Sequence, residues 1–164
     1  MKNAASIGLF AAILFGTVAH AAEVPAPSVP YPAGYRVWPH VKSMLIYSDK
    51  HPLFASFGGL HHIYVNRTGL KASKAQGTYP EGTVLVFDLL QVQEDQGAYI
   101  EGPRKLVAVM LKNSKRFKTT GGWGFEAFKA GDPKQRVVTN PAGQCFGCHT
   151  SQKEHDYVFS TFRE

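Results

Sequence analysis

The chain has 164 residues, of which 44% are hydrophobic and 18% charged, with a formal net charge of +6 at pH 7. This length is typical of one domain with a sizeable core. The positive charge suits acidic redox partners or simply solubility, and because the basic residues are scattered along the chain, nucleic acid is not an expected partner.

The N-terminus has the parts of a secretory signal peptide. Lys2 gives a basic start, residues 4–18 are mostly apolar, and Ala19-His20-Ala21 is a small-x-small cleavage pattern. The apolar run is shorter than the roughly 20 residues that span a bilayer, which favours a cleaved signal over a membrane anchor. We expect a soluble, periplasmic protein with no membrane attachment after cleavage. The predicted parts are a signal peptide at 1–21, a proline-rich leader at 22–34 and one domain at 35–164.

The elements predicted after the leader are mostly strands. Residues 83–92 and 105–111 are apolar at nearly every position, which suits strands covered on both faces. The whole pattern indicates a mainly β domain of the α+β class. In chain order we expect a short helix with irregular chain at 35–48, a strand at 60–65, a helix at 67–76, a turn at 79–82, strands at 83–92, 105–111 and 121–128, a loop at 94–97, and one or two short helices at 145–162.

The two cysteines of the chain, Cys145 and Cys148, are followed directly by His149. A disulfide between adjacent helical turns would close a very small loop and constrain little. Zinc would need a second pair of ligands, which the sequence lacks. The pattern therefore predicts one covalently attached haem c, with both thiols bonded to vinyl groups and His149 as the proximal iron ligand. The competing interpretation is a solvent-exposed turn without a cofactor.

We call residues 145–149 the haem box. It lies close to the C-terminus, and residues 150–164 after it contain no methionine. Met44 and Met110 lie in apolar stretches, where core packing is the expected role. The sixth iron position is therefore predicted to be open, which favours small-molecule binding over electron transfer. Four-helix cytochromes c′ also have a C-terminal box, but the glycines, prolines and β-type runs of this chain argue against that architecture.

A series of short motifs precedes and follows the box, and together they carry a family resemblance. They are Tyr35-Arg36-x-Trp38, Ile63-Tyr64-Val65-Asn66, Tyr79-Pro80-Glu81-Gly82-Thr83-Val84, Lys112-Asn113-Ser114-Lys115-Arg116-Phe117, Gly121-Gly122-Trp123-Gly124-Phe125 and Asp156-Tyr157-Val158-Phe159-x-x-Phe162. In this order and spacing the chain resembles the cytochrome P-460 and cytochrome c′-beta family over roughly residues 35–162. The resemblance implies a mainly antiparallel sheet with short helices, usually a homodimer, and a five-coordinate haem with His149 proximal.

The resemblance implies one of two chemistries. P-460 enzymes oxidise hydroxylamine, pass electrons to a cytochrome c, and carry a lysine–haem cross-link. At the aligned position this chain has Phe87, which cannot form that bond, so the resemblance favours the c′-beta branch, which binds gases such as nitric oxide beneath an aromatic cap. Lys71, Lys74 and Lys105 remain outside candidates for a cross-link, although solvated surface lysines are the simpler interpretation.

On the distal side of the iron we expect Phe87 and Phe57 as the cap, with Phe54 as an alternative to Phe57 and ordinary core packing as the competing interpretation. An apolar cap offers no hydrogen-bond donor, so it disfavours oxygen adducts while tolerating nitric oxide or carbon monoxide. His61 and His62 are adjacent on a strand, so one points in and one out. His61 could serve as a distal base or sixth ligand, or as a core histidine.

The predicted function is binding, scavenging or sensing of nitric oxide, carbon monoxide and similar diatomic gases by an exported mono-haem cytochrome, with no residue assigned a catalytic role. The expected partners are the gas, a cytochrome as candidate redox partner, and a second copy of the chain. Two alternatives stay open, a hydroxylamine-oxidising P-460-type oxidoreductase and an electron-transfer cytochrome c. Arg116 or Arg136 is expected to pair with the haem propionates, and Trp123, Phe125 and Phe128 to pack around the sheet.

Overall fold

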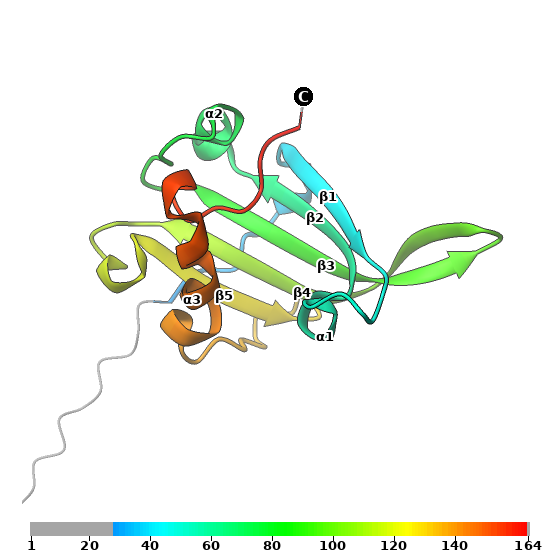
Figure 1. Ribbon diagram of the computed structural model, residues 1–164. Coiled ribbons are helices and arrows are strands. Elements are labelled where there is room, and N and C mark those ends of the chain that lie inside the picture. The colour runs from blue at the N-terminus through cyan, green and yellow to red at the C-terminus, as the bar shows by residue number, and fades with distance from the viewer. Residues whose placement is uncertain (1–27, 164) are drawn as a thin grey trace, which may run out of the picture.

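The computed structural model describes residues 28–163, and the predicted signal peptide lies outside them. The described chain is built on one antiparallel sheet whose five strands lie side by side in chain order (Figure 1). The predicted mainly β fold, with an antiparallel sheet and short helices, is confirmed. The strands are β1 (His40–Ile46), β2 (Gly59–Val65), β3 (Val84–Asp95), β4 (Ala98–Lys112) and β5 (Trp123–Lys129).

The helices are short and lie around the sheet. The longest, α2, starts at a side-chain cap, since the Asn66 carboxamide oxygen accepts the backbone N–H of Gly69 at 3.1 Å. A helix over 67–76 was predicted and is confirmed. The helices are η1 (Tyr35–Val37), α1 (Phe54–Phe57), α2 (Arg67–Ala75), η2 (Lys118–Thr120), η3 (Ala142–Phe146), α3 (Gly147–His149) and η4 (Thr150–His155).

Two regions differ from the sequence prediction. Residues 40–46 form the edge strand β1 where irregular chain was expected, because a register shift between His40 and Lys42 disrupts the apolar alternation of a strand that pairs on one side only. Met44, expected in the core, is 48% exposed there. Residues 94–97 were predicted as a loop, but β3 and β4 continue to a two-residue turn in which Gln96 and Gly97 both have positive φ.

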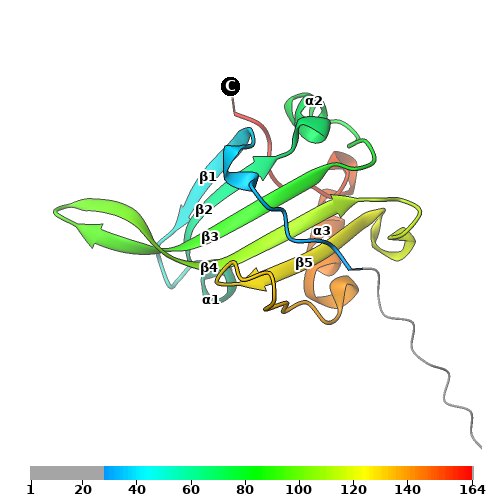
Figure 2. The same ribbon diagram turned by 180° about the vertical axis from the view of Figure 1, so that it is seen from behind.

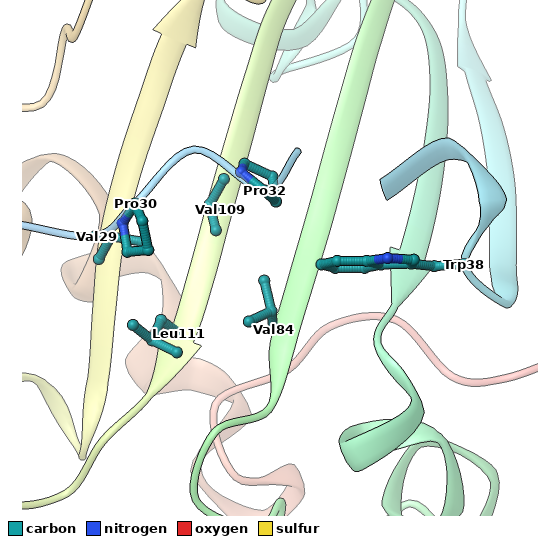
Figure 3. Close-up of a pocket in the computed structure, with 7 residues that line it drawn as sticks. All are labelled: Val29, Pro30, Pro32, Trp38, Val84, Val109 and Leu111. Atoms are coloured by element: carbon teal, nitrogen blue, oxygen red, sulfur yellow. The ribbon is translucent and has the colours of Figure 1, made fainter. Parts of the chain in front are cut away.

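The sheet has two different faces, and we call the first the leader face. It carries Tyr64, Val86, Val107 and Val109, all buried. The described end of the proline-rich leader crosses it (Figure 2), and Val29 there is only 1% exposed. A cavity of about 50 Å³ remains between the two layers (Figure 3), lined by Val29, Pro30, Pro32, Trp38, Val84, Val109 and Leu111. The leader from residue 28 onward is therefore part of the packed domain.

The opposite face, which we call the box face, carries Leu85, Phe87, Met110 and Phe125. The helices of the haem box and the C-terminal tail lie on it, with α2 at its edge (Figure 1). The fold thus brings the C-terminal motif onto a sheet built from the middle of the chain. Within residues 28–163, no helix combines the length and the apolar character that crossing a membrane requires.

Candidate haem-binding site

The haem box lies on the short helical segment formed by η3 and α3. Cys145 and Phe146 pack against the core of the box face, whereas Cys148 is exposed. Both thiols are free. Burial raises the pKa of Cys145 to about 11, which keeps it a neutral thiol at ordinary pH. Two unpaired sulfur atoms on adjacent turns are what covalent attachment to two vinyl groups requires.

His149 is held in one orientation by its neighbours. Its ring contacts those of Phe125 and Phe159, with centroids 5.0 Å away in each case. Its Nδ1 lies 2.7 Å from the backbone carbonyl oxygen of Tyr157, and because a carbonyl only accepts, Nδ1 carries the proton. Burial lowers the pKa of His149, so the ring is neutral. Nε2 then keeps its lone pair, as an iron ligand must.

The middle of the box face is an apolar strip that the protein covers incompletely. Phe87, Ala108 and Met110 are only partly buried, although they lie on strands paired on both sides. On the leader face of the same strands, Val86 and Val107 are 0% exposed. Phe87 pairs with Ala108, and Ala108 with Ala127, so small side chains occupy the strip beside the phenylalanine. A flat apolar group such as a haem fits this surface, and the residues of the box fit its attachment.

The structure brings the three predicted distal residues together next to this strip. The rings of Phe57 and Phe87 meet edge-on with centroids 5.6 Å apart. The His61 ring lies 4.7 Å from that of Phe87. Phe54 lies on the same helix as Phe57 but three residues earlier. The cap role of these side chains stays a prediction, but the contacts between them are those a cap would need.

His61 and Lys105 hold α1 from two different strands. His61 is 2% exposed, and its Nε2 donates to the Phe57 carbonyl at 2.7 Å. Burial lowers its pKa, so the ring is neutral. The Nζ of Lys105 donates to the Gly58 carbonyl at 2.6 Å. The one ring proton of neutral His61 is thus engaged with backbone, as in a core histidine, whereas Lys105 uses one of the three N–H groups of its ammonium.

The remaining lysines and histidine of the sequence prediction lie elsewhere. Lys71 is exposed on α2, and the Nζ of Lys74 lies 5.0 Å from the ring centre of Phe162. His62 points to the other face from His61, as expected for neighbours on a strand, and its Nε2 lies 2.8 Å from Glu101. Of the three candidate lysines, Lys105 therefore lies nearest the distal phenylalanines.

The two arginines considered for the propionates are in different surroundings. Arg136 is engaged on the leader side, where its Nη1 lies 2.6 Å from Glu126 and donates to the Val29 carbonyl at 2.9 Å. Arg116 is exposed and its Nη2 donates to the Ser28 carbonyl at 3.4 Å, and it also lines a pocket of about 160 Å³ that includes Phe125 and Ala142, next to the start of the box. The propionate role of Arg116 or Arg136 stays a prediction.

Several residues around His149 were not predicted as part of the site. Phe125 was interpreted as sheet packing and Phe159 only as part of a motif, yet both contact the imidazole. The Tyr157 carbonyl was missed because a backbone acceptor leaves no mark in side-chain identity. The available signal was the Asp156-Tyr157 motif, which follows the box closely enough to fold back onto it.

A mainly β domain that presents two free thiols and a neutral imidazole beside an uncovered apolar strip defines a candidate c-type haem protein. The family model described as Cytochrome P460 matches residues 32–160, and the chain belongs to the cytochrome P460 family. The resemblance found in the sequence is confirmed for the family as a whole. Membership indicates a haem cofactor. A comparison with curated proteins finds no match.

Proposed function

We propose that this protein is an exported mono-haem cytochrome of the c′-beta type that binds nitric oxide, carbon monoxide and similar diatomic gases. The observation that carries the proposal is the arrangement on the box face. A neutral His149 with Nε2 free lies over β5, and the ring of Phe57 lies against Phe87 of β3. A haem attached to Cys145 and Cys148 would supply an iron that His149 binds from one side only.

The hydrogen bonding of His61 favours a ligand that needs no hydrogen-bond donor from the protein. His61 donates its Nε2 proton to the Phe57 carbonyl, and the Lys105 ammonium donates one N–H to the Gly58 carbonyl. His61 therefore has no ring proton left to stabilise a polar oxygen adduct or to assist cleavage of a peroxide, whereas the exposed Lys105 ammonium keeps two further N–H groups. The site therefore favours binding of nitric oxide or carbon monoxide over turnover.

One observation favours the competing function, oxidation of hydroxylamine by a P-460-type enzyme. Lys105 ends beside α1, with Nζ 2.6 Å from the Gly58 carbonyl, so a primary amine does lie at the distal edge of the site. Phe87 at the aligned position argues against the cross-link found in those enzymes. The proposal therefore places this chain in the gas-binding branch.

The proposal also includes the localisation of the protein, its oligomeric state and its redox partner. Export to the periplasm rests on the signal-like pattern of residues 1–21. A homodimer rests on the family resemblance, and a cytochrome as redox partner on the positive net charge. The N-terminal sequence of the mature protein tests cleavage of the signal peptide. Separation of the mature protein by size tests the homodimer.

Optical spectra combined with intact mass test the function. We expect a mass increased by one haem, a high-spin five-coordinate spectrum, and clear spectral changes with carbon monoxide and nitric oxide. The double variant Cys145→Ser/Cys148→Ser should lose the covalent mass. A low-spin spectrum unresponsive to carbon monoxide would indicate an electron carrier, and a green chromophore with a red-shifted Soret band would indicate the hydroxylamine oxidoreductase.

A further inference from the structure

The turn that holds His149 rests on a buried polar cluster. Asp156 Oδ1 lies 2.7 Å from the Nζ of Lys112, and these side chains are 10% and 7% exposed. Asp156 Oδ2 accepts the backbone N–H of Tyr79 at 2.9 Å. The Asp156 backbone carbonyl accepts the indole N–H of Trp123 at 2.8 Å. Asp156 is thus bonded to three separate parts of the sheet region.

These bonds hold a backbone conformation that the residues would not adopt freely. Asp156 and Tyr157 are consecutive non-glycine residues with φ of 51° and 66°. Side-chain-bearing residues rarely adopt such angles, and they persist where surrounding contacts fix them. Gly121 makes room for the turn, because a Cβ at that position would lie 2.5 Å from the Tyr157 ring. The result is a Tyr157 carbonyl aimed at Nδ1 of His149.

We propose that Asp156 is a positioning residue for His149, and that its ion pair with Lys112 fixes the carbonyl that orients the imidazole and sets its basicity. Hydrogen bonds from the second nitrogen of a ligating histidine are known to fix its tautomer and strengthen it as a ligand. The inference rests on the proposed function only in taking His149 as the iron ligand.

The cluster also gives a role to sequence motifs whose residues do not belong to the candidate gas-binding site. Tyr79, Lys112, Gly121 and Trp123 belong to motifs far from the box in sequence, and all of them converge on the turn at 156–157. Tyr79 and Asp156, for example, are 77 residues apart in the chain. Their shared role would be to hold the acceptor for one imidazole proton.

Loosening this turn should weaken the Nδ1–H bond of His149. A less basic imidazole donates less charge, so the iron–histidine bond weakens and the reduction potential rises. The variant Asp156→Asn keeps the size of the side chain and tolerates positive φ, but loses the charge that pairs with Lys112. The variant Lys112→Met removes the ammonium and keeps the aliphatic stem.

The test measures the iron–histidine stretching band of the ferrous protein and its midpoint potential. In Asp156→Asn and Lys112→Met we expect a lower stretching frequency and a higher potential, because a less basic imidazole donates less charge to the iron. Arg104→Met is the matched control, since it breaks a 2.7 Å ion pair with the buried Asp88 on the leader side. It should lower stability without moving either of these two values.

Two further measurements keep the outcome decisive. If Lys112→Met does not fold, Trp123→Phe removes one hydrogen bond to the same turn while keeping an aromatic ring, and should shift the frequency in the same direction. In the haem-free chain, ¹⁵N spectra of His149 should show a single tautomer in the wild type and a mixture in Asp156→Asn. Unchanged frequency, potential and tautomer in Asp156→Asn and Trp123→Phe would overturn the inference. A wild type without haem or without gas binding would instead contradict the proposed function.

Discussion

His149 lies over β5 and Phe57 against Phe87 of β3, and these two sides of the candidate site are held by different kinds of contact. The turn behind His149 is bonded through Asp156 to Tyr79, Lys112 and Trp123. Phe57 lies on a helix of four residues, is 36% exposed, and depends on the bonds that His61 and Lys105 make to two carbonyls.

The difference suggests a division of roles. A ligand that sets the properties of an iron must keep one orientation, and buried polar bonds from distant segments provide this. A side that admits a gas benefits from lower local stability, which short helices with few buried contacts have. We therefore expect substitutions on the His149 side to change stability and iron properties, and substitutions on the Phe57 side to change access.

Lys112→Met should have the largest effect on stability. It leaves the carboxylate of Asp156 buried without its counter-charge, which typically costs about 3–5 kcal/mol. Urea unfolding of the haem-loaded protein measures this cost. The double variant Lys112→Met/Asp156→Asn should recover part of the loss, because no unpaired charge remains. A cost below about 1 kcal/mol would mean that solvent screens the pair as it does at a surface.

Phe57→Ala should act mainly on access. Removing the ring that meets Phe87 opens the distal side, and we expect carbon monoxide to associate about tenfold faster, equivalent to about 1.4 kcal/mol in the barrier. Flash photolysis measures this rate. Phe54→Ala is the matched control on the same helix and should leave the rate within about twofold of the wild type. Equal effects of both substitutions would show that helix α1 as a whole, rather than the Phe57 ring, limits access.

The pH dependence of stability should distinguish His61 from exposed histidines. Burial lowers the pKa of His61, so below the unfolded value near 6.5 the unfolded chain takes up a proton that the folded chain resists. Stability should therefore fall as pH drops from about 6.5, by at most about 1.4 kcal/mol per pH unit. Unfolding of the haem-loaded protein measures the slope, which His61→Gln should flatten and His51→Gln should not. Identical slopes in all three proteins would contradict a buried neutral His61.

The sequence predicted one side of this comparison better than the other. Apolar runs identified β3 and the inner part of β4, the cysteine spacing identified the box, and the resemblance identified Phe57 and Phe87, which the structure brings into contact. The His149 side was predicted only as far as the ligand itself. The acceptor for its proton is a backbone carbonyl, and the ion pair behind it joins residues 44 positions apart. Neither a carbonyl direction nor a distant charge pair follows from local spacing.

Lys105→Met should give the smallest change in global stability, and it tests directly whether movement of α1 controls gas access. Lys105 is exposed, so the bond from its Nζ to the Gly58 carbonyl should contribute no more than about 0.5–1 kcal/mol to global stability. Losing it should nevertheless free the end of α1, because His61 then becomes the remaining side-chain bond to that helix among the described contacts. Amide exchange of residues 54–58 should accelerate several-fold, and carbon monoxide should associate about twofold faster, while Lys71→Met, an exposed lysine on α2, leaves both unchanged. If exchange accelerates and association does not, movement of α1 is not what admits the gas, and the access step must be assigned to the Phe57 and Phe87 rings alone.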